Sequence, residues 1–231
     1  MEDLARSADG QAKLLVCGAA PALVALASEG VVKGSASAAE QVAKAMAYLA
    51  NSADGQAKLL ACGAAPALVA LAGEDAVRGS AGAAEEVAAA MANLGVSADG
   101  QTKLLACGAA PALVALAGED VVKGSAGAAL YVAGTMANLG VSADGQAKLL
   151  ACGAAPALVA LAGEDAVKGS AGATQHVAIA IHNLGSLPAA KAALAAHGAM
   201  PALAALAAQS AVTASPAAAE WVGRARARLL Q

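Results

Sequence analysis

The chain has 231 residues, of which 59% are hydrophobic and 13% charged, and it contains no Phe, one Trp and two Tyr. This aliphatic composition excludes an intrinsically disordered chain, which would be polar and charged. The net charge of −3 offers no basic surface, so we expect neither nucleic acid nor a membrane as a partner. The uncharged runs are interrupted by Gly and Pro, whereas a membrane span needs about 20 consecutive apolar residues.

Internal repetition organises the chain. The string Ser-Ala-Asp-Gly-Gln begins at Ser7, Ser52, Ser97 and Ser142, at a constant interval of 45 residues, and a fifth, diverged copy follows. Intervals of this length are typical of helical solenoids. We therefore expect one solenoid domain over 1–231, with the last turn of a partial preceding repeat at 1–6, repeats at 7–51, 52–96, 97–141 and 142–186, and a diverged capping repeat at 187–231.

The first helix of each repeat should be short. In the second copy, Ser52 or Asp54 can accept a hydrogen bond from a free amide at the helix start, and Leu59 supplies part of an apolar face. The helix should end before Gly63, because glycine can take the positive φ of a helix stop. Pro66 then opens the second helix, since a proline in the first turn costs no backbone hydrogen bond.

A polar connection follows, and a longer third helix comes after it. Within this connection Val77 is an apolar position that recurs in every copy, so we expect it to pack inward. Ser80 should cap the third helix, which runs to about Leu94 and is stopped by Gly95. All three helices are rich in Ala, so none buries a full core alone and stacking of the repeats must supply it.

One position of the third helix marks the seam between repeats. It holds Met46, Met91, Met136 and Ile181 in the first four copies, and Arg226 in the last. Apolar side chains there are expected to contact the next repeat. An arginine at the same position fits a last repeat on which nothing stacks, so the C-terminal repeat is interpreted as a polar cap.

Two motifs in these helices resemble the armadillo repeat. One is Cys-Gly-Ala-Ala-Pro-Ala-Leu-Val-Ala-Leu at 62–71, where the second helix starts, and the other is Met-Ala-Asn-Leu at 91–94, where the third helix ends. The first motif recurs in all five repeats, so the resemblance covers practically the whole chain. It implies an all-α, right-handed superhelical solenoid of three-helix repeats, with third helices lining a concave groove that binds an extended peptide.

The resemblance is incomplete at one position. Armadillo proteins that bind basic peptides carry a tryptophan four residues before the asparagine of the second motif. The residues at that position here are Lys44, Ala89, Gly134, Ile179 and Arg224. The resemblance therefore implies a peptide ligand without implying a basic one.

Differences among the copies concentrate in the third helix. Repeats two and three differ at 7 of 45 positions and repeats three and four at 10 of 45, and 11 of these 17 differences fall in the window 84–92 and its equivalents. Glu86, Ala89 and Asn93 share a helix stripe through spacings of three and four. A variable stripe on a near-uniform scaffold is typical of a binding surface, and drift of solvent-facing positions is the alternative.

An asparagine amide offers both a donor and an acceptor, so Asn93, Asn138 and Asn183 are candidates to clasp successive peptide units of an extended ligand. The alternative is that they bond local backbone near their helix ends. The stripe runs from acidic to basic, which favours a ligand of mixed charge. The other candidate peptide-binding residues are Tyr48, Lys44, Glu86, Tyr131, His176, Ile179, Arg224 and Arg228.

No pattern predicts catalysis, a metal site or a cofactor. Cys17, Cys62, Cys107 and Cys152 recur at the repeat interval, which separates them by ~8–10 Å in stacked helices, beyond the ~7 Å that a disulfide allows. We expect small buried thiols, which favour a reducing compartment such as the cytoplasm. Trp221 is either a groove contact or a cover for the C-terminal end.

Two functions remain. The first is a non-catalytic scaffold that binds an extended peptide or a disordered segment of a protein partner. The second is an engineered or consensus-like scaffold without a native ligand. Such a scaffold could form a homodimer by stacking through an open N-terminal seam that includes Met1 and Leu4.

Overall fold

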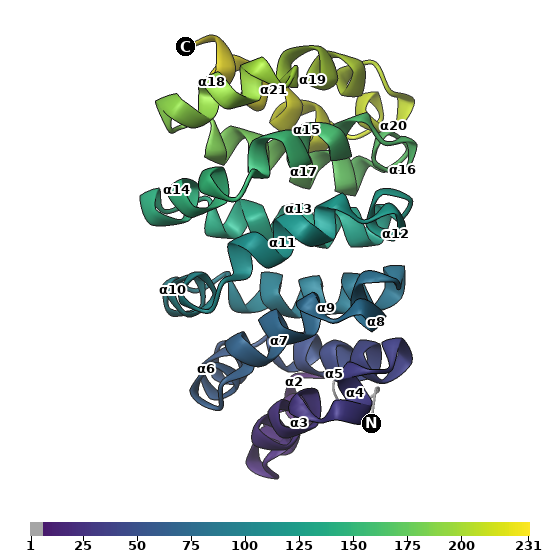
Figure 1. Cartoon of the computed structure of the whole chain (residues 1–231), viewed down its shortest axis with the longest axis vertical. Coiled ribbons are helices and arrows are strands. Elements are labelled where there is room, and N and C mark those ends of the chain that lie inside the picture. The colour runs from purple at the N-terminus through teal and green to yellow at the C-terminus, as the bar shows by residue number, and fades with distance from the viewer. Residues whose placement is uncertain (1–6) are drawn as a thin grey trace. The chain divides into compact units, whose positions relative to one another are not determined.

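The computed structural model describes residues 7–231, and all of their regular structure is helical (Figure 1). They form two compact units, of which the first reaches to Ala112 and the second begins at Leu113. The partial repeat expected at 1–6, with Met1 and Leu4, lies outside the described residues. Four groups of helices recur with the sequence repeat.

The first helices begin at a serine cap. Ser52 Oγ accepts a hydrogen bond from Gly55 N at 3.1 Å, whereas Asp54 pairs with Lys58 at 3.0 Å along the helix surface. The serine is therefore the cap, and the aspartate contributes charge to the first turn. The first helices are α2 (Ala8–Val16), α6 (Ala53–Ala61), α10 (Ala98–Ala106), α14 (Ala143–Ala151) and α18 (Pro188–Ala196).

A glycine with positive φ separates the first helix from the second. Gly63 has a φ of 87°, which confirms the predicted helix stop. The second helix begins at Ala64, two residues earlier than predicted, so Pro66 lies in its first turn without opening it. The second helices are α3 (Ala19–Ser28), α7 (Ala64–Gly73), α11 (Ala109–Gly118), α15 (Ala154–Gly163) and α19 (Ala199–Ala207).

The connection to the third helix contains a one-turn helix that the sequence analysis did not predict. Val77 lies on this turn and is fully buried, which confirms that it packs inward. The turn lets an otherwise polar segment bury one side chain while its backbone stays hydrogen-bonded. The one-turn helices are α4 (Gly30–Lys33), α8 (Asp75–Arg78), α12 (Asp120–Lys123), α16 (Asp165–Lys168) and α20 (Ser210–Thr213).

The third helices have the predicted boundaries. Ser80 Oγ accepts from Ala83 N at 3.3 Å, and the helix ends at Leu94. Gly95 has a φ of −72°, so this helix end does not use the positive φ that only glycine tolerates well, and Ala50 serves equally in the first repeat. The third helices are α5 (Ala36–Leu49), α9 (Ala81–Leu94), α13 (Ala126–Leu139), α17 (Ala171–Leu184) and α21 (Pro216–Leu230).

Third helices pack against one another within each unit. α5 packs against α9 in the first unit, and α17 lies between α13 and α21 in the second (Figure 1). The seam residues Met46 and Ile181 are fully buried, whereas Arg226, at the same repeat position in α21, is exposed. This burial pattern agrees with apolar stacking between repeats and a polar last helix.

The cysteines lie at the corners between first and second helices. All four are free, as expected, but Cys17 is exposed and Cys62, Cys107 and Cys152 are half-buried. The prediction of buried thiols was wrong, because the position that caps the end of the first helix keeps part of its surface in solvent. No single described helix is long and apolar enough to cross a membrane. Five pairs of first and second helices are together long and apolar enough, but each pair is bent by more than 40°.

Candidate functional site

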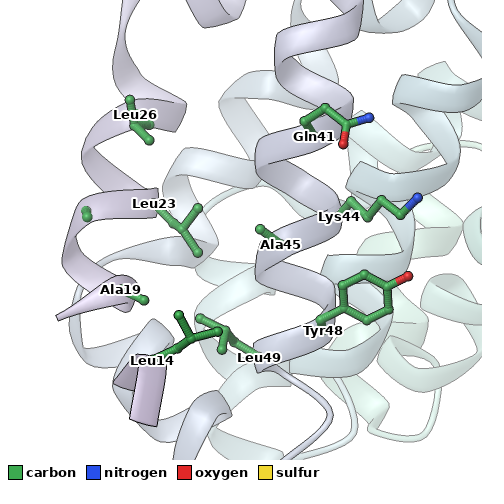
Figure 2. Close-up of a pocket in the computed structure, with 10 residues that line it drawn as sticks. Leu14, Ala19, Leu23, Leu26, Gln41, Lys44, Ala45, Tyr48 and Leu49 are labelled. Carbon is green, nitrogen blue, oxygen red and sulfur yellow. The ribbon is translucent and has the colours of Figure 1, made fainter. Parts of the chain in front are cut away.

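In the first unit the candidate residues lie on two packed helices. Lys44 and Tyr48 belong to α5, and Glu86 and Asn93 belong to α9. All four side chains are half-buried, which leaves part of each within reach of a ligand. Figure 2 shows Lys44 and Tyr48 projecting from the same side of α5.

Asparagine amides of the stripe bind the preceding third helix. Asn93 Nδ2 donates to the carbonyl oxygen of Ala47 at 2.9 Å and to Asn51 Oδ1 at 3.0 Å. Asn183 Nδ2 donates to the carbonyl oxygen of Ala137 at 2.9 Å. The partners are therefore neither the asparagine's own helix nor the local turn. These amides link neighbouring third helices through residues that are 46 positions apart in sequence.

These bonds define what each amide can still offer a ligand. Both Nδ2 hydrogens of Asn93 are used, so its Oδ1 is the atom that can accept from a peptide N–H. Asn183 makes no second side-chain bond among the described residues and so keeps one N–H as well as Oδ1. The bond to the neighbouring helix also orients the amide, because Nδ2 must face the carbonyl oxygen to which it donates.

We expect Asn183→Ala to lower the free energy of unfolding by about 1 kcal/mol, the usual net contribution of one hydrogen bond. The loss arises because Ala137 in α13 and α17 would no longer be linked. Chemical denaturation monitored by circular dichroism measures it. Gln209→Ala is the matched control, since that amide donates only to Ala205 within its own segment. Equal losses in the two variants would contradict a specific inter-repeat role.

In the second unit the stripe residue His176 sits over a glycine. A Cβ at Gly134 would lie 3.0 Å from His176 Cδ2, so the ring of His176 packs on the bare backbone of α13. His176 Nδ1 lies 2.9 Å from the carbonyl oxygen of Gly172 in its own helix. Tyr131 and Ile179 are half-buried on the same pair of helices. The variable positions are therefore coupled: a small residue in one repeat accommodates a large one in the next.

Part of the variable window is core rather than surface. Thr135 and Thr174 are fully buried. The hydroxyl of Thr135 donates to the carbonyl oxygen of Tyr131 at 2.8 Å, and the hydroxyl of Thr174 donates to that of Val167 at 2.9 Å. Variation at these positions cannot reflect ligand contact. The half-buried positions of the window stay candidates for ligand contact, whereas these two threonines and the seam residue Ile181 belong to the core.

An acidic pair occupies the start of the stripe in the first unit. Glu40 on α5 and Glu85 on α9 hold the same repeat position. Burial raises the pKa of Glu85, and the charge of Glu40 raises it further. The carboxylate of Glu40 lies over Gly82, where a Cβ would be 2.6 Å from Oε2. A cationic ligand group would relieve the repulsion between the two carboxylates.

The predicted site residues Arg224 and Arg228 meet His182, which was not predicted as a site residue, where α17 meets α21. The ring of His182 contacts Trp221 edge-on, with centroids 5.7 Å apart. The guanidinium of Arg224 lies 4.8 Å from the centre of the same indole, and Arg224 also pairs with Glu220. The predicted site residue Arg228 approaches His182 from the next turn. The preceding repeats hold alanine at the position of His182, and this difference was the one sequence signal that could have identified His182.

Burial lowers the pKa of His182 below its ordinary 6.5. A hydrogen bond to the carbonyl oxygen of Arg224 raises the pKa, and the positive charges of Arg228 and Arg224 lower it. The folded state therefore binds fewer protons than the unfolded state just below pH 6.5. The contribution of neutral His182 to the free energy of unfolding is complete above pH 6.5. It is lost as the pH falls through the lowered pKa of His182.

We expect the His182 imidazole to titrate below pH 6.5 in an NMR pH series. Between about pH 7 and pH 5.5 the free energy of unfolding should fall more for the wild type than for His182→Gln. The difference should be a fraction of a kcal/mol because the ring is partly solvated. Parallel pH dependences of the two proteins would contradict this assignment.

The opposite end of the chain presents an apolar cavity of about 340 Å³, lined by α2, α3 and α5. Figure 2 shows Leu14 and Leu23 facing the side of α5 that carries Ala45 and Leu49. Leu26 also lines it and is 46% exposed. The leucines at the same positions of the second repeat, Leu59, Leu68 and Leu71, are fully buried.

Among residues 7–231, no group of three or more His, Cys, Asp or Glu side chains is placed to hold a metal ion. No family model matches the sequence, and no curated protein matches it.

Solved structures match nearly the whole chain. One engineered protein has a TM-score of 0.82 at 21% identity, covering 98% of this chain and 88% of its own. A designed armadillo repeat protein has a TM-score of 0.77 at 24% identity, covering 98% of this chain and 89% of its own. A second, in complex with the peptide (KR)4, has a TM-score of 0.78 at 24% identity with the same coverage. The chain therefore has the all-α armadillo repeat fold, as the two motifs predicted.

Proposed function

We propose that this chain is a non-catalytic scaffold that binds an extended peptide segment of a protein partner along its third helices. One observation carries the proposal: Asn93 and Asn183 hold the same position of the third helix, both are half-buried, and each donates to the preceding third helix so that its Oδ1 can accept a bond. The structural neighbour in complex with (KR)4 supports it, because that protein has the same fold and a peptide ligand.

The proposed recognition divides between backbone and side chains. Two residues of extended peptide span ~6.6 Å, and packed helices lie ~8–10 Å apart, so each asparagine could accept from about every second peptide N–H. The stripe residues between the asparagines would contact the ligand side chains. Glu85 and Glu86 favour a cationic ligand group, whereas Arg224 and Arg228 favour an anionic one. We therefore propose a ligand of mixed charge.

A library of extended peptides tests this function. We expect mixed-charge peptides to bind more tightly than (KR)4. In the triple variant Asn93→Ala, Asn138→Ala, Asn183→Ala, their affinity should fall by about tenfold or more, which corresponds to about 1.4 kcal/mol. Gln209→Ala should bind like the wild type. The helical signal must be unchanged, because two of these asparagines also link helices. Failure of every peptide, or full affinity in the folded triple variant, would contradict the proposal.

A second candidate is self-association through the N-terminal face, which the apolar cavity favours. We propose that two copies would meet through this face on each chain, because its cavity is apolar and leaves Leu26 46% exposed. Light scattering over a concentration series should then show a dimer that Leu26→Glu abolishes. Val31→Glu is the matched control, since Val31 is 83% exposed and does not line the cavity. A monomer at all concentrations would exclude this function.

A further inference from the structure

The contact between α17 and α21 leaves a cleft of about 300 Å³ within the second unit. It is lined by His182, Arg224, Ala227, Arg228 and Gln231, and we refer to it as the arginine cleft. Two guanidinium groups and an imidazole therefore face one small volume. No acidic side chain lines it.

Hydrogen-bond chemistry settles the state of the imidazole. Arg228 Nη2 lies 3.4 Å from His182 Nε2, and because arginine can only donate, Nε2 must be the acceptor. His182 Nδ1 then carries the proton and donates to the carbonyl oxygen of Arg224 at 3.2 Å. A neutral His182 therefore holds Arg228 in place without neutralising its charge.

Arg228 has donors that the described residues do not satisfy. Its Nε is buried and has no hydrogen-bond partner, and it makes no ion pair within the described part of the chain. The aliphatic stem of Arg228 packs on Gly185, since a Cβ built at Gly185 would lie 3.2 Å from Arg228 Cγ. A positioned guanidinium with unused donors is suited to a planar anion that can accept two parallel bonds.

Arg224 forms the second wall of the cleft. Its guanidinium stacks on the indole of Trp221 and pairs with Glu220, but both members of that ion pair are more than half exposed. Exposed ion pairs contribute little, so Arg224 can exchange Glu220 for another carboxylate. Trp221, which the sequence left between two roles, supports this arginine.

We propose that the arginine cleft binds one carboxylate of a peptide ligand, with Arg228 as the main contact and Arg224 as the second. The partial negative charge at the C-terminal ends of α17 and α21 opposes any anion, and it opposes a dianion more than a singly charged carboxylate. The inference rests on the proposed peptide-binding function and names one group of the ligand. The carboxylate can come from an Asp or Glu side chain or from the peptide's C-terminus.

The test uses four short peptides with the full chain at constant ionic strength. Acetyl-Ala-Glu-Ala-amide is compared with its Gln form, and acetyl-Ala-Ala-Ala with a free carboxylate is compared with its amide. Trp221 is the chain's one tryptophan and contacts His182 and Arg224 of the cleft, so its indole NMR signal and its fluorescence respond to binding there. We expect at least one acid to bind about tenfold more tightly than its neutral partner. The pair that does so identifies the source of the carboxylate.

Two variants of equal charge locate the binding. Arg228→Gln should weaken binding of the acid by about tenfold, and Arg226→Gln should leave it within about twofold, because Arg226 is exposed and outside the cleft. A circular dichroism melt confirms that both are folded. Equal weakening in both variants, or no response of Trp221 to either acid, would overturn the proposal. Inorganic phosphate binding as tightly as the acids would overturn its selectivity for carboxylate.

These peptides are too short to span several asparagines, which separates the two hypotheses. Binding of the acids without any hit in the extended-peptide library would keep the cleft and reject the longer peptide site. Extended peptides that bind with an affinity unaffected by Arg228→Gln would keep the longer peptide site and reject the cleft.

Discussion

Gly145→Ala should lower the free energy of unfolding by about 3 kcal/mol, the upper part of the range for overpacked sites. A Cβ at this position would overlap the carbonyl oxygen of Leu139 and lie 2.8 Å from its carbonyl carbon and 3.0 Å from Ser142 Oγ. Backbone atoms cannot move aside as a flexible side chain can. The helix α14 would therefore shift away from the end of α13 and weaken its serine cap.

The matched control is Gly163→Ala in the same repeat. Gly163 is exposed at the end of α15, and a Cβ there would meet nothing within 4 Å. This substitution should be neutral or slightly stabilising, since alanine favours helix over glycine by up to about 1 kcal/mol. Chemical denaturation of both variants measures the difference. Similar stabilities would show that the close approach of α14 to α13 is not required. The last repeat has Ala190 at this position, together with a changed helix start, Leu187-Pro188 in place of Ser-Ala.

Leu71→Ala should lower the free energy of unfolding by about 3 kcal/mol, whereas Leu26→Ala should lower it by about 1 kcal/mol. The two residues hold the same position in neighbouring repeats, but Leu71 is fully buried and Leu26 is 46% exposed. Truncating Leu71 leaves a cavity between α3 and α7, which pack together. Truncating Leu26 removes a side chain that already contacts water over much of its surface.

Because these variants share residue type, helix position and flanking sequence, the comparison isolates burial by the neighbouring repeat. Denaturation followed by hydrogen exchange of each repeat is the appropriate measurement, since repeat arrays can unfold in parts. Equal losses would mean that the first repeat is covered as fully as the second. That result would support self-association through the N-terminal face and contradict the exposure seen for Leu26.

The armadillo fold was predictable because its signals are local and are repeated five times. Ser80 caps a helix, Gly63 takes a positive φ and Val77 carries the one inward side chain of the connection. Each depends on a backbone preference or a hydrophobic position that one segment holds by itself. The one-turn helices were missed because four residues carry too little periodicity to distinguish a turn of helix from a loop.

The candidate site was predictable only in outline. The spacing of Glu86, Ala89 and Asn93 placed them on one stripe, but it could not show that Asn93 donates to Ala47, which belongs to another repeat. Thr135 looked like part of a variable surface and is buried. Residues that face inward and outward can share a sequence window, and only the packed neighbours distinguish them.

The sequence by itself determined the repeat length, the helices and their caps, because these follow from interactions within about one turn of the chain. Tertiary structure alone decided which polar groups meet. His182 of α17 holds Arg228 of α21, and Asn183 of α17 reaches the backbone of α13, through contacts between residues about 46 positions apart. The geometry of such contacts depends on how neighbouring helices pack, to within tenths of an ångström, and no local preference encodes it.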